Sequence, residues 1–260
     1  MITLMLTFSC QQEEDLQLEE NSLTEIEQKL ESLHFNIDDI EIIDFLLPDG
    51  NTQQMYKVEN DIVLSEKQIL NMEEGEIGTR QYRTYNLANF GAYTIIGYTG
   101  GGGYGLSSKA RTALSWAVNN YNSLNLGIHL QLSYGTNYGN KDLVVYNNPS
   151  ESGNGGVSGF PSNGNPYKWI QIYGMEGYST NANEHVITHE IGHSFGLRHT
   201  DWFSRQSCGQ SGEAAGWDGA LHIPGTPTGY DSTSLMLACF NGGTNGEFNT
   251  NDRTALNYLY

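Results

Sequence analysis

A run of apolar residues at helical spacing surrounds a group of histidines in the second half of the chain. The residues that share this face are Val186, Ile187, Ile191 and Phe195. Asn181 and Glu184 precede most of them at the spacing of a capping box, which marks the start of a helix. The pattern predicts a buried helix over about residues 182–196.

Shorter patterns predict the other elements. In the first part of the chain, apolar spacing from Leu23 to Leu33 indicates an amphipathic helix, and residues 40–65 read as two or three strands with a turn at Pro48 to Gly50. Further along, the pattern predicts strands at 92–100, 128–135, 142–146 and 167–174, and helices at 108–124 and 251–259. This mixture of elements predicts an α+β fold.

The segment GGGGYG at residues 100–105 fits the G-x-G-x-x-G pattern of nucleotide-binding loops. Such a loop needs an acidic residue about twenty positions further on, at the end of the next strand. The predicted strand at 128–135 has none. We therefore interpret the segment as a surface turn.

Residues within and just after the predicted helix fit the pattern H-E-x-x-H-x-x-G-x-x-H, namely His189, Glu190, His193, Gly196 and His199. Positions four apart share a helix face, so His189 and His193 can bind one metal ion. Glu190 lies beside that face, where a general base for a metal-activated water belongs. Gly196 can take the left-handed conformation that ends the helix, which allows His199 to return as the third ligand. Three histidines leave one position open, as in catalytic zinc sites.

The alternative is a histidine-rich helix whose imidazoles are satisfied within the core. Burying three imidazoles and a carboxylate on one face without a metal is costly, which favours the metal site. For His185, one turn before His189, we expect a supporting or surface role rather than metal binding.

With these residues the chain resembles the metzincin metallopeptidases, and most closely the bacterial dual-action HEIGH metallopeptidases. The wording HEIGH, the stretches SCG, IPGTP and DSTSLMLAC, and the ending NDRTALNYLY extend the resemblance over about residues 80–260. It implies a twisted mixed sheet, an active-site helix, and a loop-rich C-terminal part with a Met-turn and a final helix. Met236 would be the Met-turn methionine under the zinc. Some metzincins place a tyrosine two residues later, where this chain has Ala238.

Charge and glycine content divide the chain near residues 75–82. Residues 1–80 contain 19 acidic and 4 basic residues, a net charge of −15, and the remainder contains 11 and 8, a net charge of −3, which together give −18. Only 3 of the 31 glycines precede residue 81. The shift predicts a small acidic α+β region at residues 23–79 and a catalytic domain at residues 80–260. The acidic balance argues against nucleic acid or an anionic membrane as a partner.

Residues 1–9 are mostly apolar and are followed by Cys10 and a polar, acidic run. This is typical of the end of a lipoprotein signal peptide, after which Cys10 becomes the lipidated N-terminus and residues 10–22 form an acidic tether. The alternative is a disordered apolar N-terminus. No other segment approaches the ~20 apolar residues of a membrane span. We therefore expect a lipoprotein of the bacterial cell envelope, or a secreted protein, whose membrane contact is the lipid anchor.

Lipidation of Cys10 would leave Cys208 and Cys239 as a pair in an oxidising compartment. That setting favours a disulfide over two free buried thiols.

These features predict a zinc-dependent endopeptidase that acts on protein or peptide substrates with one catalytic zinc ion. In this mechanism His189, His193 and His199 hold the zinc, and Glu190 moves the proton. The alternative is a non-catalytic surface module that binds protein or glycan and contains a structural zinc, which would not need a base at position 190. A monomer is assumed.

Two predictions concern the approaches to the zinc. The strand at 167–174 directly precedes the active-site helix, so we expect it to border the cleft and to bind substrate as an added strand. Many metzincins are blocked by an N-terminal side chain, and Asp44, Asp49 and Asp61 lie near strand ends or turns from which a carboxylate could reach zinc. The alternative is that residues 23–79 only space the enzyme from the membrane.

Overall fold

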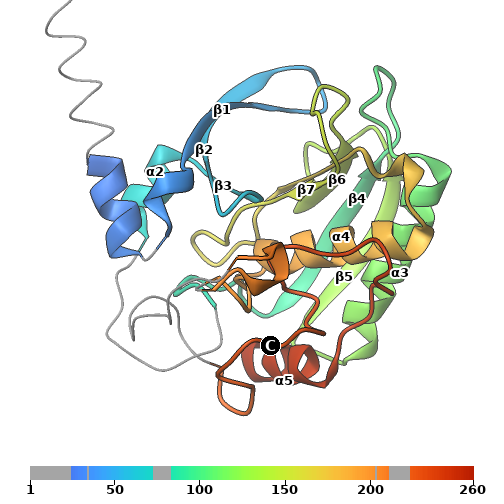
Figure 1. Ribbon diagram of the computed structural model, residues 1–260. Helices are drawn as coiled ribbons and strands as arrows, with labels where there is room; N and C mark the ends of the chain where they lie inside the picture. The colour runs from blue at the N-terminus through green and yellow to red at the C-terminus, as the bar shows by residue number, and fades with distance from the viewer. Residues whose placement is uncertain (1–24, 34, 73–82, 203, 211–222) are drawn as a thin grey trace, which may run out of the picture.

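The computed structural model describes residues 25–33, 35–72, 83–202, 204–210 and 223–260 (Figure 1). The predicted signal peptide, Cys10, the tether and the boundary at residues 75–82 therefore lie outside the described residues. Within the described part, no helix combines the length and the apolar character of a membrane-spanning segment.

The N-terminal unit, which we define as residues 25–33 and 35–72, has a small core of its own. Residues 25–32 are helical, and Ile26, Leu30 and Leu33 on one face of this segment are buried, as their spacing predicts. The other elements of the unit are η1 (Ile37–Asp39), β1 (Glu41–Leu46), β2 (Thr52–Val58), β3 (Ile62–Leu64) and α2 (Glu66–Asn71). The three strands form an antiparallel sheet in the order β1-β2-β3.

A mixed five-stranded sheet with the order β5-β4-β6-β8-β7 forms the centre of the remaining chain. Its strands are β4 (Gly91–Tyr98), β5 (Ile128–Gly135), β6 (Leu143–Asn147), β7 (Gly155–Val157) and β8 (Trp169–Tyr173). All pairings are parallel except that of β7 with β8. The predicted α+β fold with a mixed sheet is confirmed, and residues 100–105 form an exposed to half-buried turn after β4.

The strand before the active-site helix does border the cleft, through Tyr173, but the expectation that substrate adds to it as a further strand is wrong. That strand, β8, is hydrogen-bonded on both sides, to β6 and to β7, so it cannot accept a further strand. The edge is β7, a three-residue strand of sequence GGV. Two glycines in so short a run give no alternating apolar pattern, which is why the sequence did not reveal it.

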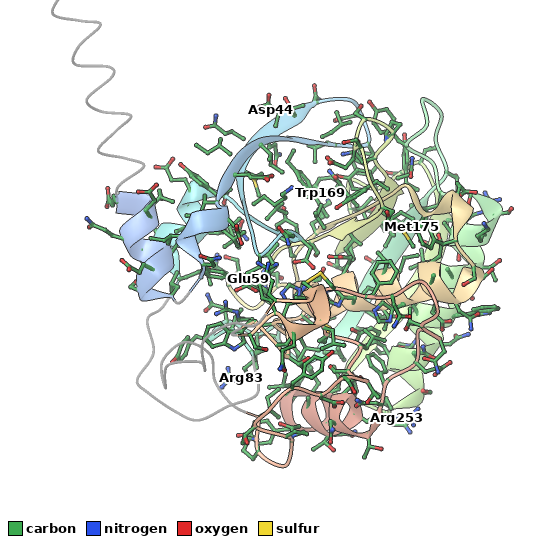
Figure 2. All side chains as sticks on the ribbon, in the orientation of Figure 1. Asp44, Glu59, Arg83, Trp169, Met175 and Arg253 are labelled. Carbon is green, nitrogen blue, oxygen red and sulfur yellow. A yellow bond between two sulfur atoms is a disulfide. The ribbon has the colours of Figure 1, made fainter. Side chains whose placement is uncertain are left out.

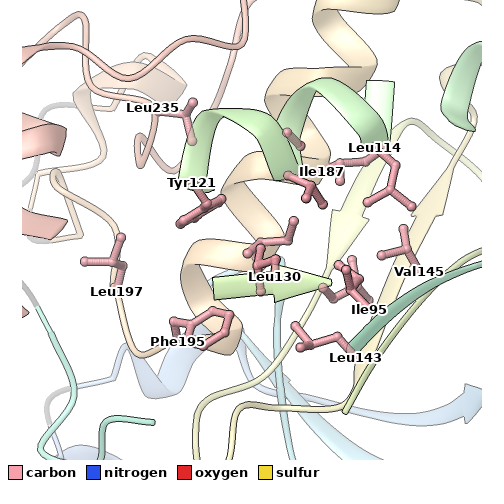
Figure 3. Packing of buried hydrophobic residues seen from close by; sticks show 14 of the residues in the cluster. Ile95, Leu114, Tyr121, Leu130, Leu143, Val145, Ile187, Phe195, Leu197 and Leu235 are labelled. Atoms are coloured by element: carbon pink, nitrogen blue, oxygen red, sulfur yellow. The ribbon is translucent and has the colours of Figure 1, made fainter. Parts of the chain in front are cut away.

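Two long helices cover one face of the five-stranded sheet. They are α3 (Ser108–Ser123) and α4 (Thr180–Ser194), and Figure 3 shows their apolar side chains packed against Ile95, Leu143 and Val145 of the sheet. Short 3-10 segments η2 (Met175–Gly177) and η3 (Gln206–Cys208) and the last helix α5 (Thr250–Leu259) complete the fold. Leu256 and Leu259 of α5 belong to the same core.

The N-terminal unit packs on the opposite side of the sheet, near β7 and β8. Buried Phe45, Met55 and Val63 of the unit share an apolar cluster with Val157 and Tyr167, and Trp169 lies between the two sheets (Figure 2). The side chains of Tyr146 and Gln171 each donate a hydrogen bond to the Leu46 carbonyl, at 2.8 and 2.7 Å. The unit is thus docked against the sheet by apolar contacts as well as hydrogen bonds.

Candidate metal centre and active site

Helix α4 brings the first two predicted ligands into the buried interior. Its N-cap is Ser179, whose hydroxyl accepts a hydrogen bond from the Ala182 amide. The predicted capping by Asn181 and Glu184 is therefore wrong, since the helix starts about two residues earlier than the capping-box spacing suggests. His189 and His193 are 5% and 0% exposed, on a helix whose residues from Ala182 onward are all buried.

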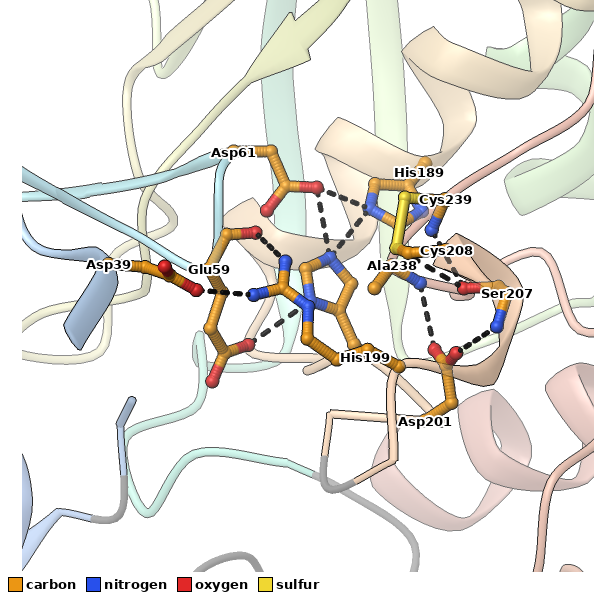
Figure 4. Close-up of a disulfide and its surroundings, with 11 residues drawn as sticks. Asp39, Glu59, Asp61, His189, His199, Asp201, Ser207, Cys208, Ala238 and Cys239 are labelled. Atoms are coloured by element: carbon orange, nitrogen blue, oxygen red, sulfur yellow. Dashed lines mark hydrogen bonds and ion pairs between the residues drawn. A yellow bond between two sulfur atoms is a disulfide. The ribbon is translucent and has the colours of Figure 1, made fainter. Parts of the chain in front are cut away.

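The end of α4 returns His199 to the same place. Gly196 has φ +101°, and the Leu197 amide donates to the Gly192 carbonyl across the reversal. A Cβ on Gly196 would lie 2.8 Å from a methyl carbon of Leu87, so the position also requires a small residue. After this turn the Nε2 atom of His199 lies 3.2 Å from that of His193. It lies 3.3 Å from Nε2 of His189, a contact that Figure 4 shows.

The other ring nitrogen of each histidine has its own partner. Nδ1 of His189 lies 2.9 Å from the Leu235 carbonyl oxygen, and Nδ1 of His193 lies 2.7 Å from that of Leu197. Nδ1 of His199 lies 3.1 Å from a carboxylate oxygen of Glu59. These acceptors place the proton on Nδ1, so that three Nε2 lone pairs converge on one point.

Three converging lone pairs fit a tetrahedral metal ion. Zinc bound to nitrogen at about 2.0–2.1 Å separates its ligand atoms by about 3.3 Å, which matches the observed Nε2 separations. Without a cation the lone pairs would repel one another. Although burial acts in the opposite direction, the carboxylates of Asp61 and Glu59 raise the pKa of His199 to about 10, so the surroundings stabilise positive charge here.

The fourth group at this point comes from the N-terminal unit. Asp61 Oδ2 lies 2.9 Å from Nε2 of His199 and 3.4 Å from Nε2 of His189, while Oδ1 is buried and makes no hydrogen bond to any described residue. The three histidines and Asp61 form a set whose ligand atoms all lie within 4.8 Å of one another. Of the three aspartates considered from the sequence, Asp44 and Asp49 are instead exposed, on β1 and on the following turn.

Sequence reasoning missed Glu59, which touches His199 from the other side. It is 3% exposed and forms an ion pair with Arg198, the residue before His199. Burial alone would raise the pKa of Glu59, but the charge of Arg198 and the contact with His199 lower it to about 2. Glu59 and Asn60 both have positive φ, at 52° and 75°, and a tight turn of this kind leaves no signal that it reaches a histidine 140 residues away.

Glu190 lies beside the three histidines, facing the edge of the sheet. It is 2% exposed, and its Oε2 makes no hydrogen bond to any described residue. A Cβ on Gly156 would lie 2.7 Å from Cγ of Glu190, so glycine in β7 makes room for this side chain. Burial, and then the nearby Asp61 carboxylate, raise the pKa of Glu190 well above its usual range. Such a carboxylate is suited to accept and release a proton.

The profile of the dual-action HEIGH metallo-peptidase family matches residues 56–260. The chain belongs to this family. It is therefore a metallopeptidase, and the matched part begins before the turn that contains Glu59 and Asp61.

Two solved structures of myroilysin are also similar to the chain. One is 14% identical with a TM-score of 0.44, over 72% of this chain and 92% of the other. The second is 13% identical with a TM-score of 0.41, over 66% and 80% of the two chains. No curated protein matches the chain significantly.

The predicted Met-turn of this HEIGH metallopeptidase lies directly behind α4. A Cβ on Gly192 would lie 2.6 Å from Sδ of Met236, so the methionine packs onto the helix between the two histidines. Asp252 of α5 fixes the turn by accepting hydrogen bonds from the Ser234 hydroxyl, at 2.7 Å, and the Leu235 amide, at 2.9 Å. Leu235 in turn supplies the carbonyl that orients His189.

A disulfide and an aspartate fix the chain after the third histidine. The structure contains the predicted bridge between Cys208 and Cys239. Asp201 is fully buried and accepts hydrogen bonds from the Ala238 amide and the Ser207 amide, both at 2.9 Å. Ala238 stands at the position where some metzincins have a tyrosine. Its contribution here is the backbone amide that donates to Asp201. Among the described residues, the tyrosine that borders the cleft is Tyr173 at the end of β8.

Proposed function

We propose that this metallopeptidase is a zinc-dependent endopeptidase of metzincin type, with His189, His193 and His199 as zinc ligands and Glu190 as general base. The observation that carries the proposal is the convergence of three Nε2 atoms, each with its Nδ1 engaged elsewhere, beside a buried carboxylate that has a free oxygen. Protein and peptide chains are the expected substrates.

When bound, zinc would supply a Lewis acid that makes water acidic near neutral pH and polarises the scissile carbonyl. Glu190 would accept one proton from the attacking water, whose oxygen forms the new bond to the carbonyl carbon. As the carbon–nitrogen bond breaks, the same carboxylic acid would deliver that proton to the leaving nitrogen. The unpaired Oε2 of Glu190 and its raised pKa both suit this transfer.

The rival function, a surface module with a structural zinc, draws support from Asp61. Three histidines and one aspartate can complete a closed four-coordinate site, which is typical of structural zinc. Glu190 speaks against this function, because a structural site has no use for a buried carboxylate with an unpaired oxygen. Asp61 also belongs to the N-terminal unit rather than to the segment that holds the three histidines.

We further propose that residues 23–79 inhibit the enzyme rather than only space it from a membrane. Asp61 occupies the position that substrate and water need. Beyond it, the Val63 amide donates to the Ser158 carbonyl and the Ser158 amide donates to the Asp61 carbonyl, at 2.7 and 2.9 Å. The segment thus pairs with the chain directly after the edge strand β7, where an extended substrate would add.

Replacing Glu190 by glutamine tests the catalytic role. The side chain keeps its size but can no longer accept the proton, so kcat on a peptide substrate should fall about 10²–10⁴-fold with zinc content unchanged. The matched control is Glu176→Gln in η2, an exposed residue whose replacement should leave the rate unchanged. Wild-type turnover by Glu190→Gln would rule the mechanism out.

Replacing Asp61 by alanine in the full chain tests inhibition. If Asp61 blocks the site, the variant keeps zinc on three histidines and cleaves peptides at least about tenfold faster than the wild type. Asp44→Ala, on the exposed side of β1, is the control and should change neither zinc content nor rate. Loss of zinc from Asp61→Ala without any gain in cleavage would instead support the structural site.

A further inference from the structure

A pocket of about 390 Å³ lies at the surface where α3, the start of α4 and the loop before α5 meet. The residues that line it are polar or aromatic and include Trp116 and Asn120 of α3, Asn181 and Glu184 of α4, and Asn245 and Glu247 of the loop. Among the described residues, none that lines this pocket also lines the cleft beside the three histidines. The pocket is therefore separate from the proposed catalytic centre.

Glu184 is the buried member of this pocket, at 3% exposure. The Asn120 amide donates to its Oε1 at 3.0 Å and to the Gly246 carbonyl at 3.2 Å, which ties the two helices and the loop together. A Cβ on Gly246 would lie 2.7 Å from Cγ of Glu184, so the loop packs directly onto this side chain. The other oxygen, Oε2, makes no hydrogen bond to any described residue and faces the pocket. A fixed carboxylate thus offers one unused acceptor to a ligand.

The pocket carries two negative charges and no positive one. Glu247 is exposed, and neither Glu247 nor Glu184 forms an ion pair with a described residue. Burial, and then the charge of Glu247, raise the pKa of Glu184 to about 7, although the hydrogen bond from Asn120 acts in the opposite direction. A cation placed between the two carboxylates would stabilise the ionised form of both.

Trp116 indicates which kind of cation fits. Its side chain is 40% exposed, and it lies one helical turn from Asn120 on the same face of α3. The face of an indole ring attracts an organic cation. A guanidinium group is planar, so it can stack on such a ring while its N–H groups donate to carboxylates in its own plane. A metal ion would use the carboxylates but would not need the exposed ring.

We propose that this pocket binds a guanidinium group, which stacks on Trp116 and donates hydrogen bonds to Glu184 and Glu247. Two sources present this group, namely an arginine side chain of a protein substrate and a small guanidinium compound. Glu184 precedes His189 by five residues, about 7.5 Å along α4, so an arginine of a substrate that lies in the cleft is near enough to bind. The substrate source rests on the proposed function, whereas binding itself does not.

Titration of the full chain with N-acetylarginine amide, followed by calorimetry, tests the pocket without any cleavage. N-acetylcitrulline amide has nearly the same shape but no charge, so it should bind at least about tenfold more weakly. Trp116→Leu and Glu247→Gln both alter exposed side chains and should each weaken binding of the arginine compound about two- to fivefold. Glu176→Gln removes one negative charge outside the pocket and should leave the affinity unchanged.

Two results of this titration would overturn the proposal. One is equal affinity for the arginine and citrulline compounds, or an affinity for the arginine compound that neither pocket variant changes. The other is binding of calcium ions alone that Glu247→Gln weakens and that the arginine compound does not displace, which would identify a metal site.

Peptide cleavage then separates the two sources of the guanidinium group. Two peptides share one cleaved sequence and carry either arginine or citrulline several residues from the scissile bond, and the full chain is used in its active form, the wild type or Asp61→Ala. If a substrate arginine is the ligand, KM should be about two- to fivefold lower for the arginine peptide with kcat unchanged, and Glu247→Gln should remove the difference. Binding of N-acetylarginine amide with no difference between the peptides would assign the pocket to a small guanidinium compound. Failure to cleave either peptide would contradict the proposed function and leave the binding result standing.

Discussion

Replacing Cys208 and Cys239 together by serine removes the covalent link between the segment after His199 and the segment after the Met-turn. The bridge spans 31 residues of sequence. In the folded protein, hydrogen bonds also join the two segments that the disulfide links. Asp201 accepts from both the Ala238 and the Ser207 amides, and the Cys239 amide donates to the Ser207 hydroxyl at 2.9 Å. The native arrangement should therefore survive, and the main effect should fall on the unfolded chain.

The loop length sets the size of that effect. In the chain-entropy model, closing a loop of this length removes unfolded-state entropy worth about 3.7 kcal/mol at 25 °C. A loss of that size lowers the melting temperature by roughly 7–15 °C in a domain of about 150–250 residues. Peptide cleavage measured well below the new melting temperature should change only a few-fold, since the hydrogen bonds of Asp201 still hold the segment after the Met-turn in place.

Thermal unfolding followed by circular dichroism measures the predicted loss. Adding a thiol reductant to the wild type should produce a similar shift, whereas the double serine variant should not respond to the reductant. A variant that melts within about 2 °C of the wild type would show that the bridge does not limit the unfolded chain.

Three other changes probe the support of the metal centre. Gly192→Ala places a Cβ 2.6 Å from Sδ of Met236, so we expect the free energy of unfolding, measured by chemical denaturation, to fall by about 1–3 kcal/mol and zinc binding to weaken. In the control Gly177→Ala the new Cβ has no neighbour within 4 Å, so the free energy of unfolding should fall far less. Equal losses in the two variants would contradict the packing argument. Asp252→Asn replaces one accepting oxygen by an NH₂ group that faces the hydrogen-bond donors of Ser234, Leu235 and Asn249, which should lower the free energy of unfolding by about 1–3 kcal/mol. Unaltered stability would exclude Asp252 as the anchor of the Met-turn. Added zinc should raise the melting temperature of the chelator-treated protein, and His199→Ala should abolish that rise; an equal rise in the variant would remove His199 from the ligand set.

The parts of the site that depend on local spacing are predictable from the sequence. His189 and His193 share a helix face wherever that helix lies, and Gly196 must end it for His199 to return. The predicted helix is present, shifted by about two residues, because several polar residues from Ser179 to Glu184 are plausible caps and only the fold selects Ser179. The α3 and α5 helices and the three strands of the N-terminal unit followed equally local patterns.

The parts that depend on contacts between distant segments were not predictable in this way. Asp61 was one of three candidates, and nothing in their local sequences separated it from Asp44 or Asp49. The edge strand β7 has too few side chains to give a pattern, so β8 was assigned its place in the cleft. The contact of Glu59 with His199 and the ring contact of His185 with Phe240 arise only when segments 55 to 140 residues apart are brought together.

The turn at Glu59 to Asp61 holds His199 at both ring nitrogens, and this constrains how the enzyme can be activated. Asp61 lies at Nε2, where under the proposed inhibition it would exclude substrate, and Glu59 lies at Nδ1, where it orients the ring. Withdrawing the turn would remove both contacts together, so the proposed blocking group cannot leave without changing the support of a proposed zinc ligand. A cut within residues 73–82 breaks none of these contacts, because the turn is also held by the hydrogen bonds to Ser158 and by the shared apolar cluster. Activation would therefore require the N-terminal unit to dissociate after the cut, and the apolar area that it buries against β7 and β8 would set how slowly it leaves.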